Sequence, residues 1–417
     1  MAAPPPPRSP LAPERFPEMP AVAGVRLAVG ASGVRYRGRD DLLLAEFAEG
    51  TAAAGVLTRS RTPGHPVLWS RAILGHGRGR ALVINAGNAN VFTGAAGDAA
   101  VRAEAEAAAG LCGCRPEEVF VASTGVIGEP LDATRITGLL PELHRRLAPG
   151  EWEAAARAIM TTDTFPKGAA AAAEIDGAPV TVAGIAKGSG MIAPNMATMI
   201  AFVVTDAHLP AALLRPLLSE ANAASFNSVT VDGDTSTSDM LLLFATGRAD
   251  HAATAAPERP DDARLASFRG ALARVTADLA RQVVRDGEGA TKLIAVTVSG
   301  AASDASARRI ALSVANSPLV KTAVAGADAN WGRVVMAVGK AGEPLDPDRL
   351  SIAFGGHAVA RDGAAVPGLD EAPVATHLRG REVAIEVDLG GIGPGRAVVW
   401  TCDLTHGYID INAAYRS

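Results

Sequence analysis

Short apolar stretches that end in glycine or asparagine alternate with alanine-rich stretches along most of this 417-residue chain. Arg80–Asn85 and Glu118–Ser123 have the composition of buried strands, and the small residues after each of them predict turns. Ala99–Gly110 and Glu151–Met160 have the composition of helices. Strands and helices each need a partner layer to bury their apolar faces. The alternation therefore predicts an α/β fold with sheets packed against helices.

The C-terminal half is expected to contain a long helix and a further sheet. Over Asp262–Arg285 apolar residues recur every three or four positions, which predicts a helix that ends at Gly287 in the left-handed conformation. Alternation of apolar and polar residues predicts strands, which we place at Leu293–Val298, Arg309–Val314, Val383–Val387 and Ala397–Cys402.

The overall charge and the hydropathy exclude two classes of partner. Lysine and arginine together number 39 against 44 aspartates and glutamates, which gives a net charge of −5. Because there is no basic surplus, we do not expect nucleic-acid binding. The longest apolar runs, such as Met240–Ala245, are far shorter than the roughly 20 residues that cross a bilayer, so no membrane association is expected.

The N-terminus and the cysteines indicate the compartment. Residues 1–22 are rich in proline and lack the apolar core of a secretory signal, which predicts a disordered tail. Of three cysteines, Cys112 and Cys114 are too close in sequence for a Cys-x-x-Cys metal site. We therefore expect buried thiols in a reducing, cytoplasmic compartment.

Three segments resemble ligand-binding motifs but fail at defining positions. Gly188–Ala193 has the letters of a dinucleotide fingerprint, yet Pro194 stands where the following helix should continue. Gly332–Lys340 lacks the spacing and the hydroxyl residue of a phosphate-binding loop. Asp232–Asp239 lacks the central glycine and final glutamate of a calcium loop, which favours a hydrogen-bonded turn. We predict no metal site.

The most informative stretch is Lys187–Asp206, in the middle of the chain. A loop of Gly, Ser and Pro leads to Thr198, which follows the small residue Ala197 and begins an apolar strand. A threonine hydroxyl is a weak nucleophile unless a base lies within hydrogen-bond reach. Cleavage of the chain in front of Thr198 would free an α-amine on the same residue, and its pKa of about 8 suits it to take the hydroxyl proton.

This stretch resembles the KGxGMIxPxMAT signature of the ornithine acetyltransferase (ArgJ) family. Further similar segments follow in order over nearly everything after the proline-rich tail; they are Asp41–Arg61, Asn85–Asn90, Ser123–Gly128, Thr161–Thr164, Thr230–Thr237, Asn316–Lys321, Asn330–Arg333 and Asp403–Tyr415. The resemblance implies an N-terminal-nucleophile-like fold of layered sheets and helices, as in DmpA and the ArgJ proteins. The chain departs from the family pattern in its proline-rich extension and at Ser228, where a longer polar residue is expected.

The resemblance also implies processing and an activity. Self-cleavage between Ala197 and Thr198 would leave an α chain, with residues 23–197 after the tail, and a β chain of residues 198–417, assembled as an α2β2 heterotetramer. N-acetylornithine would give its acetyl group to the Thr198 hydroxyl, ornithine would leave, and glutamate would take the acetyl group in arginine biosynthesis. No bound cofactor is implied, and acetyl-CoA is left open as a second acetyl donor.

Three of the implied site residues lie near expected loops. Thr124 and Gly125 begin the expected turn at residues 124–128. By themselves they would indicate only a tight turn that needs a glycine at position 125. The resemblance instead makes them the donors that stabilise the oxyanion. Lys187 by itself would be an exposed loop lysine, whereas the resemblance makes it a substrate-binding residue that pairs with a carboxylate.

The remaining implied contacts are Glu288, Thr161, Asn412 and Ser417. Glu288 follows the expected end of a helix, where the dipole does not favour a carboxylate, and the resemblance makes it a contact for a cationic amine. Thr161 alone would be a hydroxyl that bonds the last turn of a helix. Asn412 and Ser417 alone would belong to a frayed terminus.

Two other functions stay open at this point. An amidase or aminopeptidase of the same self-cleaving architecture would let water take the acyl group in place of glutamate. An unprocessed amino-acid-binding protein would use the same pocket without catalysis, although a threonine behind a small residue argues against it.

Overall fold

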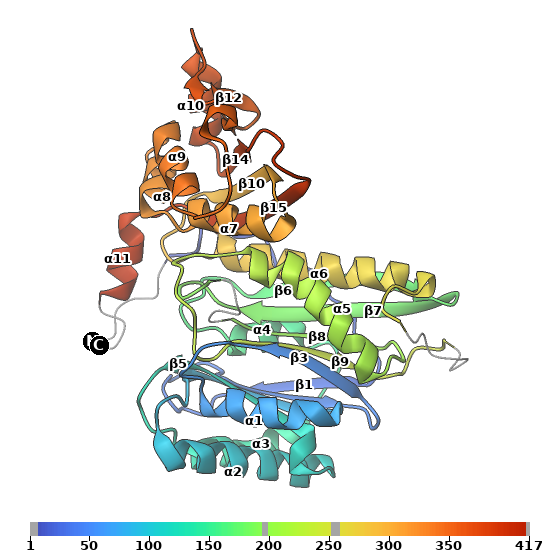
Figure 1. Ribbon diagram of the computed structural model, residues 1–417. Helices are drawn as coiled ribbons and strands as arrows, with labels where there is room; N and C mark the ends of the chain where they lie inside the picture. The colour runs from blue at the N-terminus through green and yellow to red at the C-terminus, as the bar shows by residue number, and fades with distance from the viewer. Residues whose placement is uncertain (1–6, 194–198, 252–258, 414–417) are drawn as a thin grey trace. The chain divides into compact units, whose positions relative to one another are not determined.

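The computed structural model describes residues 7–193, 199–251 and 259–413 (Figure 1). The helices of these residues are α1 (His65–Ile73), α2 (Gly94–Cys112), α3 (Ala133–Arg146), α4 (Trp152–Ala158), α5 (Ala211–Ala224), α6 (Ala266–Arg285), α7 (Asp304–Ala315), α8 (Pro318–Ala325), α9 (Trp331–Gly339), α10 (Glu371–Arg379) and α11 (His406–Asn412). The strands are β1 (Val25–Gly30), β2 (Leu42–Phe47), β3 (Ala52–Leu57), β4 (Ala81–Asn88), β5 (Val119–Val126), β6 (Lys167–Ile175), β7 (Ala178–Lys187), β8 (Ile200–Thr205), β9 (Met240–Ala245), β10 (Leu293–Ala301), β11 (Ser351–Phe354), β12 (His357–Arg361), β13 (Ala364–Ala365), β14 (Glu382–Asp388) and β15 (Gly395–Cys402).

The chain divides into two compact units. The larger unit takes the described residues of 13–227 and 234–283, and the smaller takes those of 1–12, 228–233 and 284–417. None of the helices in the described ranges is long and apolar enough to cross a membrane.

The larger unit consists of two stacked sheets with helices on both outer faces (Figure 1). One sheet has the strand order β3-β9-β8-β7-β6, and α5 and α6 cover it. The other has the order β1-β2-β4-β5 and is covered by α2 and α3. The layers confirm the predicted α/β class, and α2, α4, β4 and β5 lie where the sequence predicted helices and strands.

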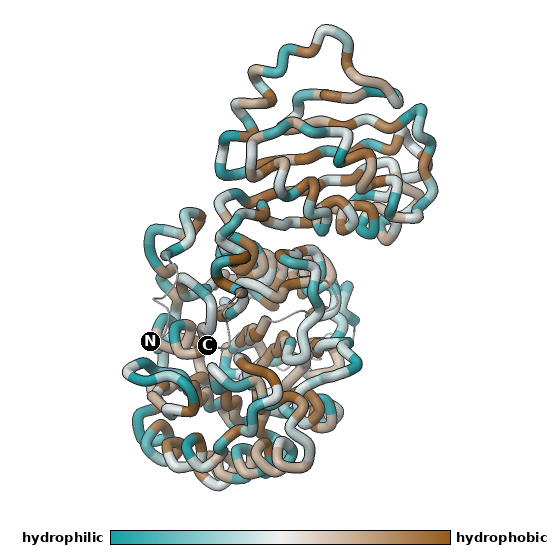
Figure 2. Tube along the Cα trace, turned by 90° about the vertical axis from the view of Figure 1, so that its left-hand side faces the viewer, coloured by the Kyte–Doolittle hydropathy of each residue, from teal (hydrophilic) through white to brown (hydrophobic). Residues whose placement is uncertain are grey.

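Side-chain alternation along β2 explains why two sheets stack. Leu43 and Phe47 belong to the apolar core between the sheets, whereas Leu42 and Leu44 belong to the core beneath α2 and α3. A strand buried on both faces reads as a nearly continuous apolar run, and β2 is apolar at every position except Glu46. Figure 2 shows that hydrophobic segments gather in the interior and hydrophilic segments in the outer loops.

The smaller unit is built on one six-stranded sheet of order β13-β12-β11-β14-β10-β15. Helix α7 packs on β10 and β15 through Ile310 and Val314, which belong to the core of this unit. The predicted strand at Arg309–Val314 is therefore wrong. Ser303 caps the helix by accepting a hydrogen bond from the Ser306 N–H, and the buried residues after it follow the helical period rather than the strand period.

The end of α6 also differs from the prediction. Helix α6 stops at Arg285 as expected, but Gly289, with φ +73°, and not Gly287, has the left-handed conformation. Gly287 is required for a different reason, because a Cβ atom there would lie 2.7 Å from the Cys402 Sγ. The glycine therefore allows close approach of two chain segments.

The N-terminal segment is more ordered than predicted over the residues that the structure describes. The Trp152 Nε1 donates a hydrogen bond of 2.9 Å to the Pro20 carbonyl oxygen, and Phe16 and Met19 pack against the core between the sheets. Residues 13–22 are therefore not a disordered tail, because Phe16 and Met19 pack against the core and the Pro20 carbonyl oxygen accepts a hydrogen bond. Residues 1–6 lie outside the described ranges.

Helix α2 buries a carboxyl group. Glu104 has no solvent exposure, and neither of its side-chain oxygens has a hydrogen-bond partner among the described residues. Burial raises the pKa of Glu104 from 4.5 to about 8. The unfolded chain therefore loses this proton at a lower pH than the folded protein does.

We expect Glu104→Gln to stabilise the protein at pH 8 more than at pH 5. A raised pKa in the folded state gives stability that is complete below the unfolded pKa and is lost as pH rises through the folded pKa. Glutamine does not titrate. The free energy of unfolding of the variant, relative to that of the wild type, should therefore increase by at most about 4 kcal/mol between pH 5 and pH 8. Urea unfolding of both proteins at the two pH values measures it, and an advantage that is equal at both would contradict the assignment.

Candidate active site

Thr124 and Gly125 lie inside strand β5 and not in a turn after it. The parallel pairing of β4 with β5 continues past the predicted strand end, with Ala86 opposite Thr124 and Gly87 opposite Gly125. Gly125 has φ +133°, and a Cβ atom there would collide with the Gly87 carbonyl group. The glycines that suggested a turn instead allow two strand backbones to approach closely.

Lys187 brings the two sheets of the larger unit together at Thr124. It is the last residue of β7, and its Nζ donates a hydrogen bond of 3.2 Å to the Thr124 Oγ1. The two residues are 2% and 1% exposed, so the alternative of an exposed loop lysine is wrong. Because the Thr124 oxygen accepts from the ammonium group, its own hydroxyl proton can be donated to another acceptor.

Asp163 is a central residue that the sequence reasoning did not single out. Its side chain is fully buried, and Oδ1 accepts hydrogen bonds from the Lys167 Nζ at 2.6 Å and from the Gly188 N–H at 2.7 Å. Its Oδ2 accepts from the Thr161 N–H at 3.0 Å and lies 3.9 Å from the Lys187 Nζ. Asp163 therefore links the predicted residues Thr161 and Lys187.

The charge state of Asp163 follows from these contacts. Burial by itself would raise the pKa of this carboxyl, but the charges of Lys167 and Lys187 and the hydrogen bond from Gly188 hold the pKa below its usual range. The carboxylate is therefore ionised at neutral pH. A signal for it was present in the sequence, since Asp163 and Lys167 stand four residues apart in a stretch with few other charges.

The predicted nucleophile Thr198, its neighbour Ala197 and the predicted contact Ser417 lie outside the described residues. The chain is described again from Met199, directly before β8. Strand β8 pairs antiparallel with β7, and Ile200 lies opposite Lys187. The backbone that follows Thr198 is therefore held beside the residue that contacts Thr124.

The smaller unit brings together two other predicted residues, Glu288 and Asn412. The Asn412 Nδ2 donates a hydrogen bond of 2.6 Å to the Glu288 Oε2 and a second one, of 3.0 Å, to the Tyr408 carbonyl oxygen. The Thr405 Oγ1, before α11, donates at 2.6 Å to the Gly289 carbonyl oxygen. Glu288 is 8% exposed, and Asn412 is exposed at the end of α11.

Comparison with known proteins gives the family. The sequence pattern of the ArgJ family matches residues 26–417. The chain belongs to the ArgJ family. It is 59% identical to an arginine biosynthesis bifunctional protein ArgJ of Gluconobacter oxydans, over 99% of this chain and 96% of that one, and 57% identical to one of Bradyrhizobium diazoefficiens, over 98% and 99%. Family membership and the layered sheets and helices together confirm the expected ArgJ-like fold class.

Solved structures of related proteins also match parts of the chain. The arginine biosynthesis bifunctional protein argJ of Bacillus halodurans is 42% identical, with a TM-score of 0.47, over 51% of this chain and 98% of that chain. An ornithine acetyltransferase of Mycobacterium tuberculosis, complexed with ornithine, is 37% identical, with a TM-score of 0.37, over 42% and 93%.

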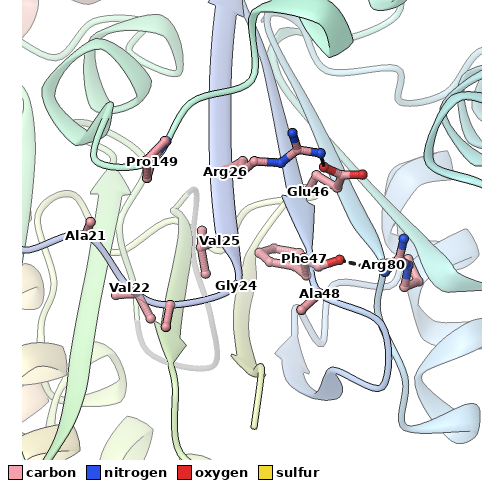
Figure 3. Close-up of a pocket in the computed structure, with 11 residues that line it drawn as sticks. Ala21, Val22, Gly24, Val25, Arg26, Glu46, Phe47, Ala48, Arg80 and Pro149 are labelled. Atoms are coloured by element: carbon pink, nitrogen blue, oxygen red, sulfur yellow. Dashed lines mark hydrogen bonds and ion pairs between the residues drawn. The ribbon is translucent and has the colours of Figure 1, made fainter. Parts of the chain in front are cut away.

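One group of metal-ligand side chains lies outside the predicted ArgJ site. Donor atoms of Glu46, Cys112 and His144 lie within 4.8 Å of one another. Arg26 already forms an ion pair with Glu46 at the side of a pocket of about 590 Å³, which Arg80 also lines (Figure 3). Burial raises the pKa of Cys112 to about 12, so the thiol stays protonated. These features favour a half-exposed Arg26–Glu46 ion pair beside a neutral thiol over a metal centre.

We expect Asp163→Asn to lower the free energy of unfolding by about 3–5 kcal/mol, because it removes the negative charge that pairs with the fully buried Lys167 ammonium. The loss should be present at every pH above the unfolded pKa of the aspartate, since a lowered folded pKa gives stability that disappears only as pH falls through it. Denaturant unfolding at pH 7 measures the loss.

Glu153→Gln is the matched control for this substitution. It breaks the exposed Glu153–Arg157 ion pair, which should cost about 1 kcal/mol or less. Equal losses in the two variants would contradict the central place of Asp163.

Proposed function

We propose that this protein transfers the acetyl group of N-acetyl-L-ornithine to L-glutamate in arginine biosynthesis, through an acetyl group carried by Thr198. The observation that carries the proposal is the buried Lys187–Thr124 contact beside the start of β8, in a chain of the ArgJ family. Relatives at 59% and 57% identity are named for arginine biosynthesis, which supports the pathway.

In the proposed reaction the Thr198 α-amine, free after self-cleavage, takes the proton of the Thr198 hydroxyl. The hydroxyl oxygen forms a bond to the acetyl carbonyl carbon, and the bond from that carbon to the ornithine nitrogen breaks. The proton passes to the departing nitrogen, and ornithine leaves. The glutamate amine then attacks the ester, takes the acetyl group and returns a proton to the threonine oxygen.

Both tetrahedral intermediates carry a negatively charged oxygen that needs donors. Thr124 and Gly125 are the proposed donors, through a hydroxyl and a backbone N–H, and donors of this kind contribute roughly 3–4 kcal/mol each. The Thr124 hydroxyl proton is available because its oxygen already accepts from Lys187. The buried ammonium of Lys187 adds a positive charge beside the same oxygen, besides its proposed contact with a substrate carboxylate.

Four residues are proposed to bind the rest of the amino-acid substrates: Thr161, Glu288, Asn412 and Ser417. A carboxylate accepts several hydrogen bonds, so Glu288 can bind the cationic amine of ornithine while it accepts one from Asn412. The Asn412 amide orients this carboxylate. The Thr161 backbone N–H donates a hydrogen bond to the Asp163 carboxylate, which fixes the position of Thr161.

We further propose that the chain is cut between Ala197 and Thr198, so that residues 23–197 and 198–417 form the α and β chains of an α2β2 heterotetramer. The reaction needs no bound cofactor, because the acetyl group arrives on a substrate. A cytoplasmic location fits the free state of Cys112, Cys114 and Cys402.

The direct test is incubation of the purified protein with N-acetylornithine and glutamate, followed by separation of the products. We expect N-acetylglutamate and ornithine in equal amounts. Thr198→Ala should lower the rate by at least about a thousandfold, because it removes the nucleophile. Thr62→Ala is the matched control, since Thr62 is exposed and contacts only neighbouring loop residues in the described structure.

The outcomes separate the alternatives. Acetate released without dependence on glutamate would indicate a hydrolase. A single uncut chain that binds substrate without turnover would indicate a binding protein. Glutamate acetylated from acetyl-CoA in the same assay would show a second donor.

A further inference from the structure

Asp239 is a buried acid at the start of β9 that none of the roles above uses. Its Oδ1 accepts a hydrogen bond of 2.8 Å from the Met199 N–H. On the other side of the same residue, the Met199 carbonyl oxygen accepts a bond of 3.0 Å from the Met240 N–H. The backbone of Met199 is therefore held at its N–H by Asp239 and at its carbonyl by Met240, the first residue of β9.

These contacts extend the parallel pairing of β8 with β9 by one residue. The regular register begins with Ile200 opposite Met240, and the carboxyl of Asp239 takes the place of a backbone acceptor for the preceding N–H. The Asp239 backbone is itself fixed, because its carbonyl oxygen accepts from the Thr58 N–H at 3.1 Å. Strand β8 lies between β9 and β7, so the backbone after Met199 is paired on both sides.

Burial of the Asp239 carboxyl is unfavourable for folding, which indicates that this side chain has a role beyond the start of β9. Asp239 has no solvent exposure, and its Oδ2 has no hydrogen-bond partner among the described residues. Burial raises the pKa of the Asp239 carboxyl well above its ordinary value, although hydrogen bonds from Met199 and Ser236 and the charge of Lys187 act in the opposite direction. A buried polar atom without a partner destabilises the folded protein.

We propose that Asp239 is a positioning residue for Thr198, whose carbonyl carbon is bonded to the Met199 nitrogen that Asp239 holds. The inference rests on the proposed function. A fixed Met199 peptide limits the positions that the preceding residue can take, since one trans peptide joins neighbouring Cα atoms at a constant distance. Asp239 would thereby act on both self-cleavage and acetyl transfer without touching the reacting atoms.

Self-cleavage is the step most sensitive to this position. The Thr198 oxygen forms a bond to the Ala197 carbonyl carbon, the peptide bond to the Thr198 nitrogen breaks, and the hydroxyl proton ends on that nitrogen. Water then hydrolyses the ester and leaves the Ala197 carboxylate and the Thr198 hydroxyl. A displacement of about 1 Å in such a reaction costs about a hundredfold in rate.

The test compares Asp239→Asn with Asp239→Ala by a time course of intact mass on freshly made protein. Asparagine keeps an oxygen that accepts from the Met199 N–H, so its cleavage rate should stay within about threefold of the wild type, whereas alanine should slow cleavage about a hundredfold or more. In the cleaved fraction of Asp239→Ala, kcat should fall while KM stays within about twofold, because substrate contacts are intact.

Two further variants separate positioning from stability. Glu104→Gln also converts a buried acid without a described partner into an amide, and it should leave the cleavage rate unchanged. Should Asp239→Ala fail to fold, Asp239→Leu keeps the branched shape of the side chain without an acceptor and should show the same slow cleavage with a cooperative unfolding transition.

Each result decides the proposal. Wild-type cleavage with an equally fast Asp239→Ala or Asp239→Leu overturns it. An Asp239→Asn variant as slow as the alanine variant also overturns it, because that result requires proton transfer by the acid in place of positioning. A wild-type chain that gives no fragment beginning at Thr198 overturns the proposed function, and the inference with it.

Discussion

The buried carboxylate of Asp163 is the interaction on which the larger unit's part of the site depends. A carboxylate without solvent is stable only if it is paired and hydrogen-bonded, and here two lysines and two backbone N–H groups meet that need. The same contacts fix the start of β6, the end of β7 and the residue after β7. Lys187 can then reach Thr124 on the other sheet, so one buried charge determines where two predicted residues meet.

Backbone spacing supplies the second constraint. Strands β4 and β5 approach closely only because Gly87 and Gly125 have no side chains at the point of contact. Thr124 lies near the carboxyl ends of these parallel strands, where ligands commonly bind. Thr124 and Gly125, the proposed oxyanion donors, thereby lie on one rigid strand, with Lys187 of the other sheet beside Thr124.

Much of this was predictable from the sequence, for identifiable reasons. The family signature, with its Lys187 and Thr198, predicted the fold class and the family. The turn at Thr124 was misplaced, since the same small residues serve a turn or two close strands, and only the pairing partner decides between them. Helix α7 was read as a strand because six residues of alternating character fit both periods. Asp163 and Asp239 were not assigned roles, because a buried acid depends on partners that are distant in the sequence, such as Met199 for Asp239.

The central claim is that Thr198 carries the acetyl group, and mass spectrometry of the intact protein tests it most directly. The purified protein would be incubated with N-acetylornithine in the absence of glutamate. The account predicts that the fragment beginning at Thr198 gains one acetyl group, located on the Thr198 side-chain oxygen, and loses it when glutamate is added. A fragment of unchanged mass, or an acetyl group on another residue, would contradict it.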